Sequence, residues 1–164
     1  MNILRKVFIK FYSSYMRIKA LLIHILLSLD LITKACFYDA DIVLIPSILK
    51  LEGHKNYGMA FSMFSNNPAY VTVFAVILTA FLIFVFIRYS NENNMLAYGI
   101  ILMLAGSIGN LIDRLVHGYV VDFICPLFVD FAVFNIADSL ITIGAAMSCI
   151  YILLNLEKGK WKST

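Results

Sequence analysis

The sequence predicts an all-α integral membrane protein with four transmembrane helices, both termini cytoplasmic, and a small β-rich extracytoplasmic cradle. Hydrophobic residues make up 62% of the 164 residues and charged residues only 14%, whereas a soluble domain usually has roughly 45–50% and 25%. Several apolar stretches are long enough to span a bilayer, and most of the lysines and arginines gather on one side of them. A small soluble domain cannot bury this much apolar surface, so a soluble globular enzyme and a disordered tail are both excluded.

The positions of the four spans follow from length. A transmembrane helix needs about 20 predominantly apolar residues. Three stretches near this length contain no charged residue: 69–87, 93–112 and 139–156. Together with a less uniform first stretch, they place the expected spans at about 20–38, 69–87, 93–114 and 138–156. We expect residues 1–164 to form a single membrane domain.

The first span is interrupted by three ionisable residues, His24, Asp30 and Lys34. Asp30 and Lys34 are four residues apart, so they share one helix face and can form an ion pair. Because Lys34 lies toward the outer end of the span, we expect its side chain to extend outward to the membrane surface.

The distribution of basic residues sets the orientation. They precede the first span, lie in the link between the second and third, and follow the fourth: Arg5, Lys6, Lys10, Arg17, Lys19, Arg88, Lys158, Lys160 and Lys162. Basic residues favour the cytoplasmic side, so both termini are expected there. Residues 1–19 form a basic amphipathic segment, either a helix on the inner membrane surface or a fraying extension of the first span. The net charge of +3 is too small to indicate nucleic-acid binding.

Two segments are expected outside the membrane on the other side. Residues 39–68 form the extracytoplasmic segment, in which 41–46 and 56–61 have the β-branched and aromatic content of short strands. Residues 117–134 form a second loop that is rich in Val, Phe and Asp and free of Lys and Arg. The three cysteines lie at wide spacings, which indicates neither a disulfide framework nor a metal-binding pair.

The carboxylates gather at the outer ends of the spans, where Asp30 reaches the same level as Asp113, Asp122 and Asp138. Ionisable groups at membrane depth are costly, so they are functional candidates. Asp122 and Asp138 have no Lys or Arg beside them, and two such carboxylates close together would share a proton. An aspartic-protease pair uses that arrangement to activate water. A solvated loop position for Asp122 stays an open alternative.

Other polar residues surround this pair in the sequence. Asn110, Asp113 and Arg114 are spaced so that all three point from one side of the third helix. Their pattern favours a structural polar cluster over direct chemistry. Asn135 lies one turn before Asp138 and is placed to hydrogen-bond to it.

Two other classes of protein fit less well. The histidines lie far apart and no HExxH motif occurs, so a zinc protease is not indicated. A proton- or ion-coupled transporter, or an accessory membrane subunit, would carry its carboxylates near the membrane midplane. Here the carboxylates lie at one end of the spans, which disfavours that alternative.

Several motifs resemble, in order, those of the bacterial lipoprotein signal peptidases, also called signal peptidase II. They are Asp30-Leu-Ile-Thr-Lys34, Asn56-Tyr-Gly-Met-Ala-Phe61, Gly106-Ser-Ile-Gly109-Asn110-Leu-Ile-Asp113-Arg114, Val121-Asp122-Phe123 and Phe134-Asn135-Ile-Ala137-Asp138. The resemblance implies a membrane aspartyl endopeptidase. It would cleave the signal peptide from diacylglyceryl-modified prolipoproteins on the amino side of the lipidated cysteine, using an Asp dyad and an activated water.

The resemblance also implies roles for individual residues. By motif position the catalytic pair is Asp122 and Asp138. Substrate-binding or supporting roles fall to Asp30, Asn56, Asn110, Asp113, Arg114 and Asn135. No cofactor or metal is implied. The partners are lipidated prolipoproteins and membrane lipid but no nucleic acid, and the chain is expected to be a monomer. The implied location is the bacterial inner membrane, with the active site at the extracytoplasmic face.

Overall fold

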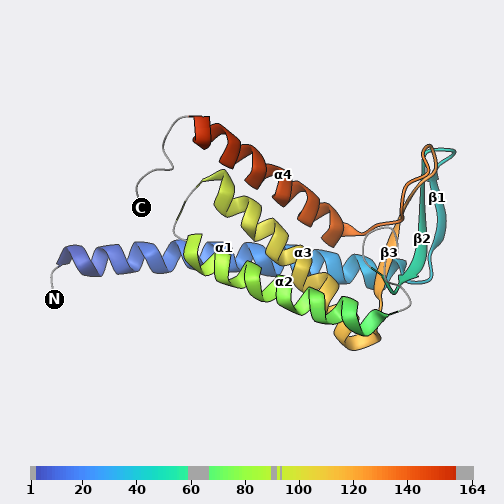
Figure 1. Cartoon of the computed structure of the whole chain (residues 1–164), viewed down its shortest axis with the longest axis horizontal. Coiled ribbons are helices and arrows are strands. Elements are labelled where there is room, and N and C mark those ends of the chain that lie inside the picture. The colour runs from blue at the N-terminus through green and yellow to red at the C-terminus, as the bar shows by residue number, and fades with distance from the viewer. Residues whose placement is uncertain (1–2, 59–66, 90–91, 93, 158–164) are drawn as a thin grey trace.

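The computed structural model describes residues 3–58, 67–89, 92 and 94–157, with the backbone alone for residues 3–15 and 157. In this part of the chain, four helices are long and apolar enough to cross a membrane. They are α1 (Ile3–Phe37), α2 (Pro68–Tyr89), α3 (Met95–His117) and α4 (Ile136–Glu157). A small three-stranded sheet lies at one end of the bundle (Figure 1). The predicted fold class of four spanning helices with a β-rich segment is confirmed, and the cytoplasmic position of the termini stays a prediction.

The helix α3 is the centre of the bundle. It packs against α1, α2 and α4, and its buried side chains include Ile101 and Leu104. The outer helices α2 and α4 leave many large apolar side chains exposed, as expected for surfaces that face lipid. Small residues bring α3 and α4 close together, since a Cβ atom on Gly99 would lie 2.7 Å from the carbonyl oxygen of Gly144.

The helix α1 runs without a break from Ile3 to Phe37. In Figure 1 its N-terminal part extends beyond the other helices along the same axis. Residues 3–15 therefore continue the helix of the first span, and the role of residues 1–19 as a basic amphipathic segment stays a prediction.

The sheet combines strands from both loop segments. Its order is β1-β2-β3, with β1 at Asp41–Ile45, β2 at Leu49–Asn56 and β3 at Val120–Pro126, and both strand pairs are antiparallel. The predicted strand at 41–46 is confirmed as β1. The second strand was placed wrongly at 56–61, because β2 ends at Asn56; residues 59–61 lie outside the described residues. β2 pairs on both sides, and its partner β3 comes from the distant second loop, which was not predicted to contain a strand.

Two glycines fix how the sheet meets the helices. A Cβ atom on Gly53 would overlap the carbonyl oxygen of Tyr38, so only glycine lets β2 approach the end of α1 this closely. Gly118 has a φ of 80°, in the left-handed region, and its N–H donates to the carbonyl oxygen of Arg114. This arrangement ends α3 and turns the chain into β3, which carries Asp122.

Candidate active site

Lys34 lies at the centre of a buried polar network. Its ammonium nitrogen is 2.8 Å from Asp30 Oδ2 and 3.2 Å from Asp113 Oδ2, and it donates to Asn110 Oδ1 at 2.9 Å. Only 3% of the side chain is exposed. The prediction that Lys34 extends outward to the membrane surface is wrong, because two carboxylates inside the bundle attract the ammonium group inward.

Asp30 joins α1 to the start of α4. Its Oδ1 accepts a hydrogen bond of 2.8 Å from the backbone N–H of Ala137, one of the first helical N–H groups, which have no carbonyl partner within their own helix. The Asp30 carboxylate occupies the space beside Gly109, where a Cβ atom would overlap Oδ2. The side chain is fully buried. Asp30 thereby brings α1, α3 and α4 together at one point.

Asp113 and Arg114 hold different parts of the sheet. Asp113 Oδ2 accepts a hydrogen bond of 3.1 Å from the backbone N–H of Val121, at the start of β3. Arg114 donates from Nη2 to the carbonyl oxygen of Gly58 at 3.0 Å, just after β2. These contacts agree with the interpretation of the Asn110, Asp113 and Arg114 pattern as a polar cluster that joins the ends of elements.

Asp122 lies within β3 and is buried, with 3% of its surface exposed. Asn135 donates from Nδ2 to Oδ1 at 2.7 Å, and Asn56 donates from Nδ2 to Oδ2 at 2.9 Å. Asn56 reaches this carboxylate because β2 and β3 are neighbouring strands. The alternative of a solvated loop position for Asp122 is therefore wrong.

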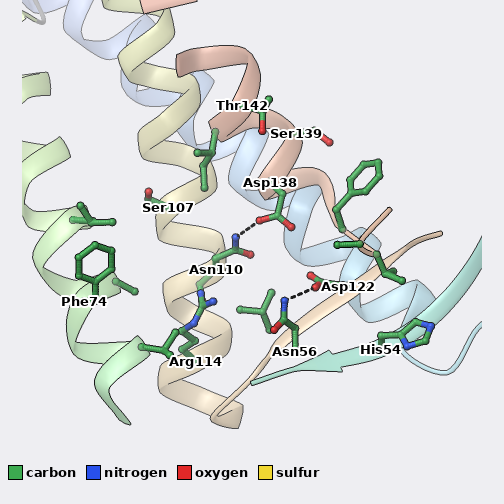
Figure 2. Close-up of a pocket in the computed structure, with 18 of the residues that line it drawn as sticks. His54, Asn56, Phe74, Ser107, Asn110, Arg114, Asp122, Asp138, Ser139 and Thr142 are labelled. Carbon is green, nitrogen blue, oxygen red and sulfur yellow. Dashed lines mark hydrogen bonds between the residues drawn. The ribbon is translucent and has the colours of Figure 1, made fainter. Parts of the chain in front are cut away.

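Asp138 lies in the first turn of α4. Its Oδ2 accepts from the backbone N–H of Asn135 at 3.2 Å, while its own N–H donates to Asn135 Oδ1 at 2.9 Å. This reciprocal pair resembles a capping box at the helix N-terminus. The other carboxylate oxygen, Oδ1, accepts from Asn110 Nδ2 at 2.8 Å. Figure 2 shows Asn110 from α3 reaching Asp138, and Asn56 reaching Asp122.

The two carboxylates are thus held by uncharged amide groups. Each oxygen of Asp122 and Asp138 accepts a hydrogen bond from an asparagine side chain or a backbone N–H. The pKa of Asp122 is raised from 3.8 to about 7, mainly by burial and then by the neighbouring charge of Asp138. Hydrogen bonds from Asn56 and Asn135 and the charge of Lys34 oppose this rise. At neutral pH the pair can therefore hold one proton.

A cavity of about 930 Å³ lies beside this pair. Its apolar wall comes from α2 and α4 and includes Val71, Phe74, Ala75, Leu78, Ile141 and Ile143. The polar wall holds Asp122, Asp138, Asn110, Asn56 and Arg114, which Figure 2 shows converging from the sheet, α3 and α4. Within the described residues, no three His, Cys, Asp or Glu side chains are grouped so that they could hold a metal ion. The cavity offers an apolar groove next to a pair of acids.

Comparison with known proteins identifies the family. The sequence model of the Signal peptidase (SPase) II family matches residues 22–154. The chain belongs to the signal peptidase II family. Over 141 residues it is 35% identical to a lipoprotein signal peptidase of Staphylococcus carnosus (strain TM300), and the aligned region covers 82% of this chain and 89% of the relative. Over 120 residues it is 37% identical to that of Staphylococcus aureus (strain JH9), which covers 72% and 74%.

Solved structures agree with this assignment. A bacterial membrane enzyme solved by the in meso method at 2.3 Å resolution has a TM-score of 0.75 and 29% identity, over 89% of this chain and 93% of that one. A second, solved at 1.9 Å, has a TM-score of 0.68 and 29% identity, over 82% and 92%. This signal peptidase II is thus a multi-pass membrane protein and an aspartic peptidase that processes prolipoproteins. The transporter alternative is wrong.

All the site residues expected from the sequence belong to one connected network, and the structure adds a residue that sequence reasoning missed. Lys34 was treated only as the partner of Asp30, yet it also contacts Asp113 and Asn110. The sequence did contain a signal. Asp113 is expected at the same membrane level as Lys34, and no Lys or Arg lies one helical turn before Asp113 on its own helix to pair with it. Recognising the contact required knowing that α1 and α3 are neighbours.

Proposed function

We propose that Asp122 and Asp138 are the catalytic dyad of this signal peptidase II. The observation that carries the proposal is their environment. Both carboxylates line one cavity and accept hydrogen bonds from neutral amides, and the pKa of Asp122 is raised to about 7. Asp138 lies at the N-terminus of α4, where the helix dipole favours a negative charge. We therefore assign the resting proton to Asp122 and the ionised carboxylate to Asp138.

The chemistry follows from this assignment. Asp138 takes a proton from water while the water oxygen bonds to the carbonyl carbon of the scissile peptide, and Asp122 gives its proton to the carbonyl oxygen. The product is a neutral diol. Asp138 then passes its proton to the amide nitrogen, the C–N bond breaks, and Asp122 recovers a proton from a diol hydroxyl. A new carboxylic acid and a new amine leave, and both aspartates return to their starting states.

The substrate position is proposed from the cavity. The apolar wall formed by α2 and α4 would accept the signal helix and the diacylglyceryl chains, both of which are membrane-resident. Cleavage would fall on the amino side of the lipidated cysteine, where the chain emerges beside the dyad. The basic residues at the opposite end of the bundle support an extracytoplasmic site. One chain supplies every contact of the dyad described above, which supports a monomeric enzyme.

The test is cleavage of a purified diacylglyceryl-modified prolipoprotein by enzyme in proteoliposomes, read as a gel shift. Asp122→Asn and Asp138→Asn are each expected to lower cleavage by about a thousandfold, in line with the loss of a general acid or base. Asp130→Asn is the matched control, because Asp130 is exposed in the same loop and should leave cleavage unchanged. The unlipidated substrate should not be cut. Full activity in either Asp122→Asn or Asp138→Asn would remove that residue from the dyad.

A further inference from the structure

Asn110 is the residue through which α3 reaches the proposed dyad, and its side-chain amide has a single favourable orientation. Its Oδ1 accepts from Lys34 at 2.9 Å and from Asn135 at 3.2 Å, and its Nδ2 donates to Asp138 at 2.8 Å. If the amide were flipped, its NH₂ group would face the donors of Lys34 and Asn135, and its oxygen would face a carboxylate. The amide orientation that gives Asp138 its donor therefore depends on Lys34 and Asn135, which donate to the oxygen of Asn110.

Lys34 is the stronger of the two groups that set this orientation. Its contact with Asn110 is charge-assisted, whereas the Nδ2 group of Asn135 is divided among Asn110, the carbonyl oxygen of Val121 and Asp122. The ammonium is buried, and its contacts with Asp30 and Asp113 keep it in place. An ammonium has three N–H donors, and three oxygen atoms, from Asp30, Asp113 and Asn110, lie within 3.2 Å of it.

We infer that Lys34 is a positioning residue for the reaction, whose ammonium group fixes the Asn110 amide so that its NH₂ group faces Asp138. The inference rests on the proposed dyad. Lys34 acts through Asn110, and its positive charge also acts on Asp122 from the α1 side. A lysine that only neutralised Asp30 and Asp113 would hold the fold together without affecting the chemistry, and the two roles give different kinetics.

The first test compares Lys34→Met with Lys50→Met. Lys50 is a matched control, because its ammonium lies 2.9 Å from Asp41 and 2.6 Å from Glu52, between two carboxylates, but in the sheet and outside the cavity. Lys34→Met should lower kcat for the lipidated prolipoprotein by about tenfold to a hundredfold, the equivalent of one hydrogen bond to a charged group, with KM within about threefold. Lys50→Met should change neither.

The second readout is the dependence of kcat on pH. The charged groups around Asp122 are Asp138 from α4, Lys34 from α1 and Arg114 from α3; its strand neighbour is His54 from β2. Removing the positive charge of Lys34 raises the pKa of Asp122, so the high-pH limb of the profile should move to higher pH. An unmoved limb would show that the charge of Lys34 does not act on Asp122, and the positioning of Asn110 is tested by a double-mutant cycle.

The third readout is a double-mutant cycle. In an Asn110→Ala background, Lys34→Met should lower kcat by less than about threefold further, because the group it positions is gone.

If Lys34→Met does not fold in a thermal unfolding assay, Lys34→Arg replaces it, since arginine keeps the charge but its longer head displaces the Asn110 amide. Unchanged kcat per folded enzyme and an unchanged pH profile would overturn the inference, as would additive losses. Asp138→Asn is assayed alongside; if it is active, the dyad itself is wrong, whatever Lys34 does.

Discussion

Replacing Asp122 by Asn should stabilise the folded protein at high pH while removing its activity. Burial raises the pKa of Asp122 from 3.8 to about 7, so the folded state resists ionisation that the unfolded chain allows. At 1.36 kcal/mol for each pH unit, this difference costs about 4 kcal/mol of folding free energy above pH 7. An uncharged side chain avoids that cost.

The gain is partly offset by a hydrogen bond. Asn56 and Asn135 both donate to the Asp122 carboxylate. An asparagine at position 122 would place its own NH₂ group against one of these two donors, and the lost hydrogen bond lowers the free energy of unfolding by about 2 kcal/mol. The net gain above pH 7 is then about 2 kcal/mol, or roughly 4–8 °C in Tm at about 2–4 °C for each kcal/mol.

The sign of the effect should depend on pH. An acid whose folded pKa is raised lowers stability progressively as pH rises from 3.8 to about 7, because the unfolded state then holds fewer protons than the folded state. Near pH 4.5 the ionisation cost has fallen to about 1 kcal/mol, less than the cost of the lost hydrogen bond, so Asp122→Asn should melt below wild type. Thermal unfolding in detergent at pH 4.5 and pH 8 tests this, with the exposed Asp130→Asn as control. A Tm difference of the same size and sign at both pH values would refute the reasoning.

Three further substitutions have defined outcomes. Gly109→Ala should destabilise the protein by about 3 kcal/mol in thermal unfolding, because its Cβ displaces the Asp30 carboxylate from a buried ion pair; an unchanged Tm would contradict this. Asn56→Asp should lower kcat by more than tenfold, since a carboxylate would replace the donor to Asp122. The matched change Asn94→Asp, at the N-cap of α3 and away from the cavity, should not. Arg114→Lys should raise KM several-fold with a smaller change in kcat, because Arg114 lines the cavity and its guanidinium contact with Gly58 is lost; a loss confined to kcat would count against that role.

The spans were predictable because lipid imposes a local rule. α2 and α4 are predominantly apolar over about the thickness of a bilayer, so length and composition alone locate them. The strand β1 was also predictable, since 41–46 carries its own β-branched pattern. β2 and β3 were not, because their hydrogen bonds join segments far apart in the chain, and β3 contributes a partner on which the position of β2 depends.

The candidate site divides in the same way. The absence of a cation beside Asp122 and Asp138 in the sequence indicated an acid pair, and the order of the motifs indicated the family. The direction of Lys34 could not be read from α1, because its second carboxylate, Asp113, is on α3. The position of Lys34 near the end of the span favours a side chain that extends outward, and only the packing of α1 against α3 turns it inward.

The most direct test of the dyad is the rate at which the lipidated prolipoprotein is cut by wild type, Asp122→Asn and Asp138→Asn at pH 6 and pH 8.5, with the products identified by mass spectrometry. Wild type should release the lipidated cysteine as a new N-terminus, faster at pH 6 than at pH 8.5, because Asp122 loses its proton above about pH 7. Both variants should be about a thousandfold slower at each pH. Cleavage near the wild-type rate by either variant, or a wild-type rate that is the same at both pH values, would contradict the assignment of Asp122 and Asp138 as an acid–base pair.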